Sequence, residues 1–205
     1  TIYLGDTARV PYGIRSPETV TRYSFENTQF LLSQEIKMLV VACNTASAIS
    51  LDAVKQEFPL PVLGVLEPGA RAAIAATRKG KIGVIGTEAT IGSGAYERTI
   101  RSLKPDIEVL TQACPLFVSL VEEGWTDNDV AELVARRYLG GLRDRGIDTL
   151  VLGCTHYPLL KKVIARVMGS GITLIDSATE TAREVAEVLA KLNWLRPDGG
   201  GVGRR

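Results

Sequence analysis

The chain has 205 residues, of which 45% are apolar, and a formal net charge of +1. This length allows one large domain or two small ones with a packed core. The charge gives no electrostatic basis for binding nucleic acid or a membrane, and no apolar run approaches the roughly 18 residues of a membrane span. Three cysteines do not make a disulfide framework, so we expect a reducing, cytoplasmic location.

Strand-like and helix-like segments alternate along the chain. Short apolar runs predict strands at Ile2–Leu4, Met38–Ala42, Val62–Val65, Lys81–Ile85, Ile107–Leu110, Thr149–Leu152 and Ile172–Ile175. Amphipathic segments predict helices at Pro17–Ser33, Ala46–Glu57, Pro68–Arg78, Gly92–Leu103, Asp127–Arg145, Pro158–Met168 and Thr179–Leu192. Expected helix starts are Ser16-Pro17, Thr126-Asp127 and Pro158, and an expected helix stop is Gly146. This alternation indicates βαβ units and parallel sheets.

Two segments are near-copies of each other, LVVACNTAS around Cys43 and LVLGCTHYP around Cys154. In each, a buried strand is predicted to deliver a thiol to its carboxyl end, just before the next helix begins. Backbone N–H groups and the positive end of the helix then favour the thiolate. Two matched thiols predict chemistry with an acid on one face of a substrate and a base on the other.

The repeat predicts an α/β fold of two similar lobes, each a mainly parallel sheet flanked by helices, with the active site in the cleft between them. We place the crossings near residues 67–69 and 176–177. The first lobe is then 1–67 plus 177–195, and the second is 68–176. The Gly-rich, basic segment 196–205 is expected to be a disordered tail. The chain opens at Thr1 in what reads as a strand, so we expect a fragment of a longer protein without a visible signal peptide.

Other interpretations of the cysteines remain open. Either thiol could be a buried structural residue. His156 is the only histidine and follows Cys154 by two residues, where it can activate the thiol or relay its proton. Cys43, Cys154 and His156 could also meet around zinc, or the two thiols could form a redox pair. Cys114 is followed by proline and apolar residues and is expected in the core.

Three further segments carry weaker signals. The residues 6–9 and 11–13 follow the first predicted strand and form either a ligand-binding loop or a plain turn. Gly86-Thr87 leads from a strand into a helix and is a weak candidate anion site. Glu122 and Glu123 read, by themselves, as a solvated helix end.

The motifs DTARVPYG, ACNTAS, ACPLFVSLVEEG and LGCTHYPLL, in this order over nearly the whole chain, resemble the bacterial glutamate racemases. The DTAR-x-PYG motif distinguishes this group from the related aspartate and hydantoin racemases. The resemblance implies an isomerase that interconverts L-glutamate and D-glutamate without a cofactor or metal and supplies D-glutamate for peptidoglycan. It also implies a homodimer, with no nucleic-acid or membrane partner.

Residue roles follow from the resemblance. Cys43 is expected to act on D-glutamate and Cys154 on L-glutamate, with His156 and Glu122 assisting Cys154. The positions that match substrate contacts are Pro11, Tyr12, Gly13, Asn44, Thr45, Thr155 and His156.

The chain departs from the family pattern in three places. The family's first strand, with an Asp that assists the first cysteine, would precede Thr1. Ser119 replaces a proline, and RPDGGGVGRR replaces the usual C-terminal segment. We therefore expect this chain alone to be less active than its parent protein. The alternatives are a non-catalytic binding or regulatory protein on the same scaffold, or a racemase of another amino acid such as aspartate.

Overall fold

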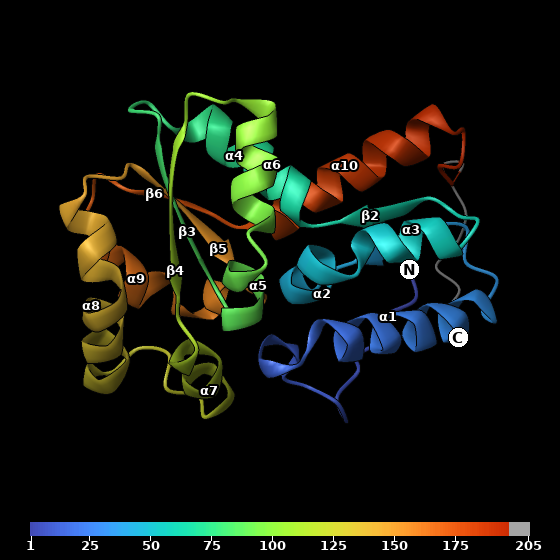
Figure 1. The fold of residues 1–205 in the computed structure, drawn as a ribbon, viewed down its shortest axis with the longest axis horizontal. Coiled ribbons are helices and arrows are strands. Elements are labelled where there is room, and N and C mark those ends of the chain that lie inside the picture. The colour runs from blue at the N-terminus through green and yellow to red at the C-terminus, as the bar shows by residue number, and fades with distance from the viewer. Residues whose placement is uncertain (197–205) are drawn as a thin grey trace.

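Helices and parallel strands alternate along the computed structural model, which describes residues 1–196 (Figure 1). The strands are β1 (Leu39–Val41), β2 (Val62–Gly64), β3 (Lys81–Gly86), β4 (Glu108–Ala113), β5 (Thr149–Gly153) and β6 (Thr173–Ile175). The helices are α1 (Pro17–Leu32), α2 (Asn44–Ile49), α3 (Leu51–Glu57), α4 (Leu66–Ala76), α5 (Glu88–Gly92), α6 (Ala95–Leu103), α7 (Leu116–Glu122), α8 (Asp129–Asp144), α9 (Lys161–Met168) and α10 (Ser177–Lys191). Single 3₁₀ turns stand at η1 (Tyr12–Ile14) and η2 (Tyr157–Leu160).

The strands form two separate parallel sheets. One has the order β4-β3-β5-β6, and the other pairs β1 with β2. This arrangement confirms the predicted α/β fold of two lobes with parallel sheets. The lobe boundaries at residues 67–69 and 176–177 stay a prediction, as does the tail, which from residue 197 on lies outside the described residues.

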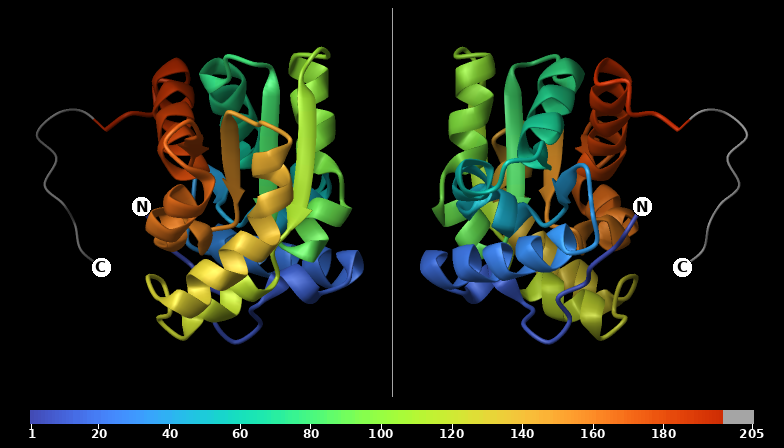
Figure 2. Two further views of the ribbon diagram at one scale, coloured as in Figure 1. Left: turned by 90° about the vertical axis from the view of Figure 1, so that its left-hand side faces the viewer. Right: turned by 90° about the vertical axis from the view of Figure 1, so that its right-hand side faces the viewer.

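Helices cover both faces of the four-stranded sheet, as Figure 2 shows. Successive strand side chains point to opposite faces, so β5 sends Leu150 and Leu152 into one core and Val151 into the other. The first core is completed by α8 and α9, and the second by α4 and α6. β5 is buried along its whole length and carries an apolar run at its centre, which is why the sequence predicts it well.

The smaller sheet packs its apolar residues against α1 and α3. Leu39 of β1 and Val62 of β2 share a core with Val54 and Phe58, and the ring of Phe25 meets Phe58 edge-on at 5.4 Å. In Figure 1, α10 runs beside β2 and α4, and it contacts both of them. Within the described residues, no helix is long and apolar enough to cross a membrane.

The strand predicted at Ile2–Leu4 is wrong. These residues belong to no ladder, and β1 pairs with β2 alone among the described strands. Tyr3 is 88% exposed, and its ring lies over Gly5 rather than in a core. Three apolar residues carry no periodicity, so this run held no information about a hydrogen-bonding partner.

Two predicted helices differ from the structure. The segment 46–57 breaks at Ser50, whose hydroxyl lies 2.8 Å from both the carbonyl oxygen of Ala46 and the hydroxyl of Ser24. The helix predicted at 92–103 begins only at Ala95, because Gly94 adopts a left-handed conformation with φ of 66°. Helices α5 and α7 were not predicted, and the cap of α8 is Asn128 rather than Thr126-Asp127.

Candidate active site

The first thiol stands where the smaller sheet meets a helix. Cys43 follows β1 and forms the N-cap of α2, so its sulfur faces the first backbone N–H groups of that helix. The N–H groups of Thr45 and Ala46 and the hydroxyl of Thr45 lie close enough to lower the pKa of the thiol. Asn44 and Thr45, which follow in the sequence, are almost fully buried.

The second thiol occupies the corresponding place in the larger sheet. Cys154 directly follows β5 and precedes the turn η2, and it is 8% exposed. Backbone N–H groups of Thr155, His156 and Tyr157 contact its sulfur. The near-copy in the sequence therefore corresponds to a repeat in space, in which each sheet delivers one cysteine from the carboxyl end of a strand.

A histidine and a glutamate extend from Cys154. The Nδ1 atom of His156 lies 3.7 Å from the Cys154 sulfur, and its Nε2 atom lies 2.5 Å from Oε1 of Glu122. Glu122 ends α7 with a side chain that is 65% exposed, while that of His156 is 26% exposed. The carboxylate, the imidazole and the thiol thus form a chain that leads from solvent to the buried sulfur.

Burial dominates the acidity of both thiols. It raises the pKa of Cys43 although the N–H groups of α2 lower it. It also raises the pKa of Cys154 to about 12; the N–H of His156 opposes this rise, and a charge on Cys43 adds to it. The prediction that the helix ends favour thiolate is therefore wrong in its net direction, because desolvation outweighs the backbone donors.

Both cysteines line one cavity of about 850 Å³ between the lobes. The predicted substrate-contacting residues Pro11, Tyr12, Gly13, Asn44, Thr45, Thr155 and His156 all line it as well. Glu122 does not, and reaches the cavity only through His156. Cys114 is fully buried in the core of the larger lobe, which confirms the expectation that it is a core residue.

Threonine hydroxyls join the lobes beside the cavity. The Oγ1 atoms of Thr45, Thr87 and Thr90 lie 2.9–3.0 Å from one another, with Thr45 on α2 and the other two at the start of α5. Thr87 also lines the cavity. The sequence indicates Thr87 only as a weak candidate anion site, and Thr90 was not predicted, since a Thr at a helix start is typical of an ordinary cap.

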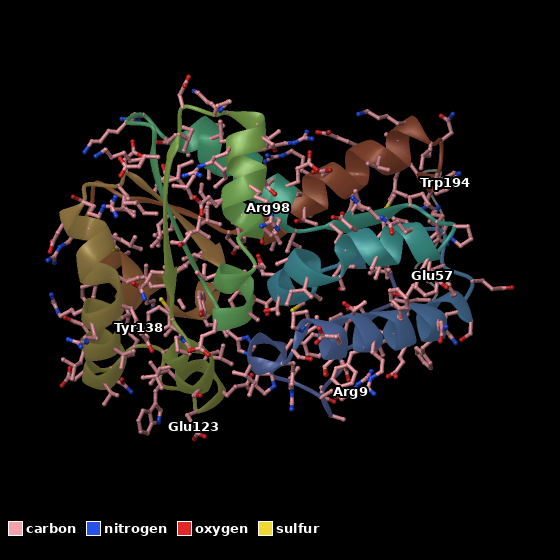
Figure 3. The ribbon with its side chains drawn as sticks, in the orientation of Figure 1. Arg9, Glu57, Arg98, Glu123, Tyr138 and Trp194 are labelled. Carbon is pink, nitrogen blue, oxygen red and sulfur yellow. The ribbon has the colours of Figure 1, made fainter. Side chains whose placement is uncertain are left out.

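The loop at residues 11–13 is held from both sides. On one side the Tyr12 hydroxyl donates to Asp6, which also pairs with Arg9 at 2.8 Å, and Asn27 of α1 donates to both Asp6 and Tyr12. Figure 3 shows Arg9 beside α1. On the other side, a Cβ atom at Gly13 would lie only 2.4 Å from Cβ of Thr87.

Among residues 1–196, no group of three His, Cys, Asp or Glu side chains is placed to hold a metal ion. The three cysteines are free thiols. The site therefore consists of a half-buried thiol at Cys43, a buried thiol at Cys154, one imidazole with its carboxylate, and a lining of amide, hydroxyl and backbone N–H groups. Such a set can transfer protons and can bind an anionic ligand.

Comparison with known proteins identifies this arrangement. A family model described as Asp/Glu/Hydantoin racemase matches residues 1–185. A glutamate racemase from Geobacter metallireducens is 64% identical over 197 residues, which are 96% of this chain and 73% of that protein. The structure of glutamate racemase isoform RacE1 from Bacillus anthracis superposes with a TM-score of 0.91 at 45% identity, covering 94% of this chain and 73% of that one.

A third relative carries a ligand. The glutamate racemase from Francisella tularensis, solved in complex with D-glutamate, has a TM-score of 0.88 at 38% identity, over 94% of this chain and 72% of that one. The fold and the site define a two-lobed α/β protein with one thiol from each lobe on a shared cavity. The chain belongs to the Asp/Glu/Hydantoin racemase family, and the relatives described above are glutamate racemases.

Proposed function

We propose that this protein interconverts L-glutamate and D-glutamate by a two-thiol acid–base mechanism that needs no cofactor. The observation that carries the proposal is the pairing of Cys43 and Cys154, which come from matching strand ends of the two lobes and line one cavity. The 64% identity to a glutamate racemase supports glutamate as the substrate.

The two thiols supply the two proton transfers. With the α-carbon between them, the thiolate of one cysteine removes the α-proton and becomes a thiol. The thiol of the other donates its proton to the opposite face of the carbanion and becomes a thiolate. Each turnover thus removes one proton from the α-carbon and adds another to its opposite face, and it leaves the two cysteines with their protonation states exchanged. By the resemblance, Cys43 deprotonates D-glutamate and Cys154 deprotonates L-glutamate.

The acidity of the thiols fits this division. Burial raises the pKa of both thiols, and a negative charge on Cys43 raises the pKa of Cys154 further. The cavity therefore disfavours two thiolates at once, as two like charges in one site do. One thiolate opposite one thiol is the state that racemisation requires.

His156 and Glu122 serve the Cys154 side. The imidazole lies against the sulfur and can take up its proton, while the carboxylate beside Nε2 stabilises the imidazolium that forms. Cys43 instead contacts backbone N–H groups and the Thr45 hydroxyl. The family's assisting Asp for Cys43, in a segment before Thr1, stays part of this proposal.

The remaining lining residues would bind the substrate. Hydrogen-bond donors toward its two carboxylates are available from the Asn44 amide, the Thr45 and Thr155 hydroxyls and the backbone of the loop at 11–13. The product D-glutamate would enter peptidoglycan synthesis, and we expect the enzyme to act in the cytoplasm, as a homodimer.

The direct test is racemisation by the purified protein. L-glutamate should be converted to D-glutamate without added pyridoxal phosphate or metal, EDTA should have no effect, and in D₂O deuterium should enter at the α-carbon. Loss of activity on chelation, with recovery on adding zinc, would contradict the two-thiol mechanism. Turnover of L-aspartate in place of L-glutamate would support a racemase of another substrate. Binding of glutamate without exchange would support a non-catalytic protein.

A further inference from the structure

One buried tyrosine connects the two thiol segments. Tyr96, on α6 of the larger lobe, is 2% exposed, and its hydroxyl donates to Oδ1 of Asn44 at 2.6 Å. Asn44 directly follows Cys43 and belongs to α2 of the other lobe. This hydrogen bond spans 52 positions of sequence and joins the lobes beside the cavity.

The tyrosine side chain packs closely against the backbone at two glycines. A Cβ atom at Gly153 would lie 3.1 Å from Cε2 of the ring, and one at Gly69 would lie 3.4 Å from the hydroxyl oxygen. Gly153 is the residue before Cys154. The same side chain therefore packs on the segment of one thiol and hydrogen bonds to the segment of the other.

The hydroxyl determines which end of the Asn44 amide faces the ligand. An amide side chain has an acceptor oxygen and a donor NH₂ group, and only the donor suits a carboxylate. Burial raises the pKa of Tyr96, so its hydroxyl stays neutral and can donate. With its oxygen bound to Tyr96, Asn44 keeps both N–H bonds of its NH₂ group for the cavity that it lines.

We propose that Tyr96 is a positioning residue that orients the Asn44 amide, so that its NH₂ group donates to the substrate carboxylate. This inference rests on the proposed function, because the ligand is taken to be glutamate. Without the hydroxyl, the amide can rotate by half a turn and present its oxygen to an anion, which repels it. The tyrosine would then affect substrate binding more than proton transfer.

The test is a double-mutant cycle of Tyr96→Phe and Asn44→Ala, with kcat and KM measured for both enantiomers. Tyr96→Phe keeps the ring and removes the hydroxyl. We expect it to raise KM about tenfold, the effect of one hydrogen bond to a charged group, with kcat changed by less than about threefold. In the Asn44→Ala background the same substitution should change KM by less than about twofold, because the group that it orients is gone.

Tyr138→Phe is the matched control, since Tyr138 lies on α8 in the larger lobe, packs on Phe117 and hydrogen bonds to a backbone N–H (Figure 3). It should leave both constants unchanged. Equal effects of Tyr96→Phe with and without Asn44, or an unchanged KM, would overturn the inference while leaving the proposed function intact. An unmodified protein that does not racemise glutamate would instead overturn the proposed function, and this inference with it.

Discussion

Replacing Gly13 with alanine should separate the lobes at the cavity. The new Cβ would lie 2.4 Å from Cβ of Thr87 and 2.5 Å from its Cγ2, whereas ordinary van der Waals contact begins at about 3.4 Å. A change of rotamer cannot relieve a clash with a Cβ atom. Thr87 is also fixed by hydrogen bonds to Thr45 and Thr90. The loop at 11–13, or the whole lobe, must therefore withdraw by about 1 Å.

A shift of this size should be costly for catalysis. Displacing reacting groups by about 1 Å can reduce the rate about a hundredfold. We expect Gly13→Ala to lower kcat/KM for glutamate by about that factor. The melting temperature should fall as well, because the loop carries Tyr12, which shares a small core with Val20 and Ala46.

The assay is steady-state racemisation in both directions, together with thermal unfolding. Gly140→Ala is the control, since Gly140 lies within α8 and a Cβ there meets nothing within 4 Å. It should keep full activity and stabilise the helix by up to about 1 kcal/mol. A Gly13→Ala protein with unchanged kcat/KM would refute the claim that the close contact between Gly13 and Thr87 holds the two sides of the cavity at the distance that catalysis needs.

Three further predictions concern single side chains. Cys43→Ser should mainly slow proton removal from D-glutamate, and Cys154→Ser should mainly slow proton removal from L-glutamate, as measured by elimination from an analogue with a β-leaving group. Equal losses by both variants on one enantiomer would contradict one thiol per face. The control Cys114→Ser should cost only about 1 kcal/mol of stability. Glu122→Gln should slow L-glutamate turnover about tenfold more than Cys114→Ser does, because the imidazole loses its contact with a charged carboxylate. Equal turnover by the two variants would argue against the relay. Asp148→Asn should lower the free energy of unfolding by about 2 kcal/mol at pH 7. Hydrogen bonds lower the pKa of Asp148 despite its burial. The contribution of Asp148 to stability is therefore present above the unfolded pKa of 3.8 and is lost as the pH falls through the folded pKa. Denaturant unfolding should show a smaller loss of stability between pH 7 and pH 3 in the variant than in the unmodified protein.

The sequence was most informative where both faces of a strand are buried. Continuous apolar runs marked β3 and β5, and the repeat around Cys43 and Cys154 located both thiols at strand ends before any contact was known. Parallel order then follows from the alternation of strands and helices. The run Ile2–Leu4 failed, because a strand also needs a neighbour and no local pattern reports one.

Side chains that act across the lobes could not be predicted from local patterns. Tyr96 lies on the apolar face of an amphipathic helix and reads as an ordinary core residue. Glu122 ends a helix at the surface, and only the family resemblance connected it with His156. Both acquire their partners through pairing of distant segments, 52 positions apart for Tyr96 and 34 for Glu122. Hydrophobic periodicity reports burial and says nothing about such partners.

Under the proposed mechanism, the geometry would make the two half-reactions chemically unequal. Cys154 contacts an imidazole that a surface carboxylate supports, so its proton has a route toward solvent. Cys43 contacts neutral donors, which stabilise a thiolate in place but cannot accept its proton. Because burial opposes a charge on either sulfur, a thiolate is favoured by a positive group nearby, and among the described residues that contact the two sulfurs only His156 can become one. The two lobes repeat a strand–thiol–helix unit in the backbone, and the difference between their faces resides in the side chains that reach each sulfur from other elements.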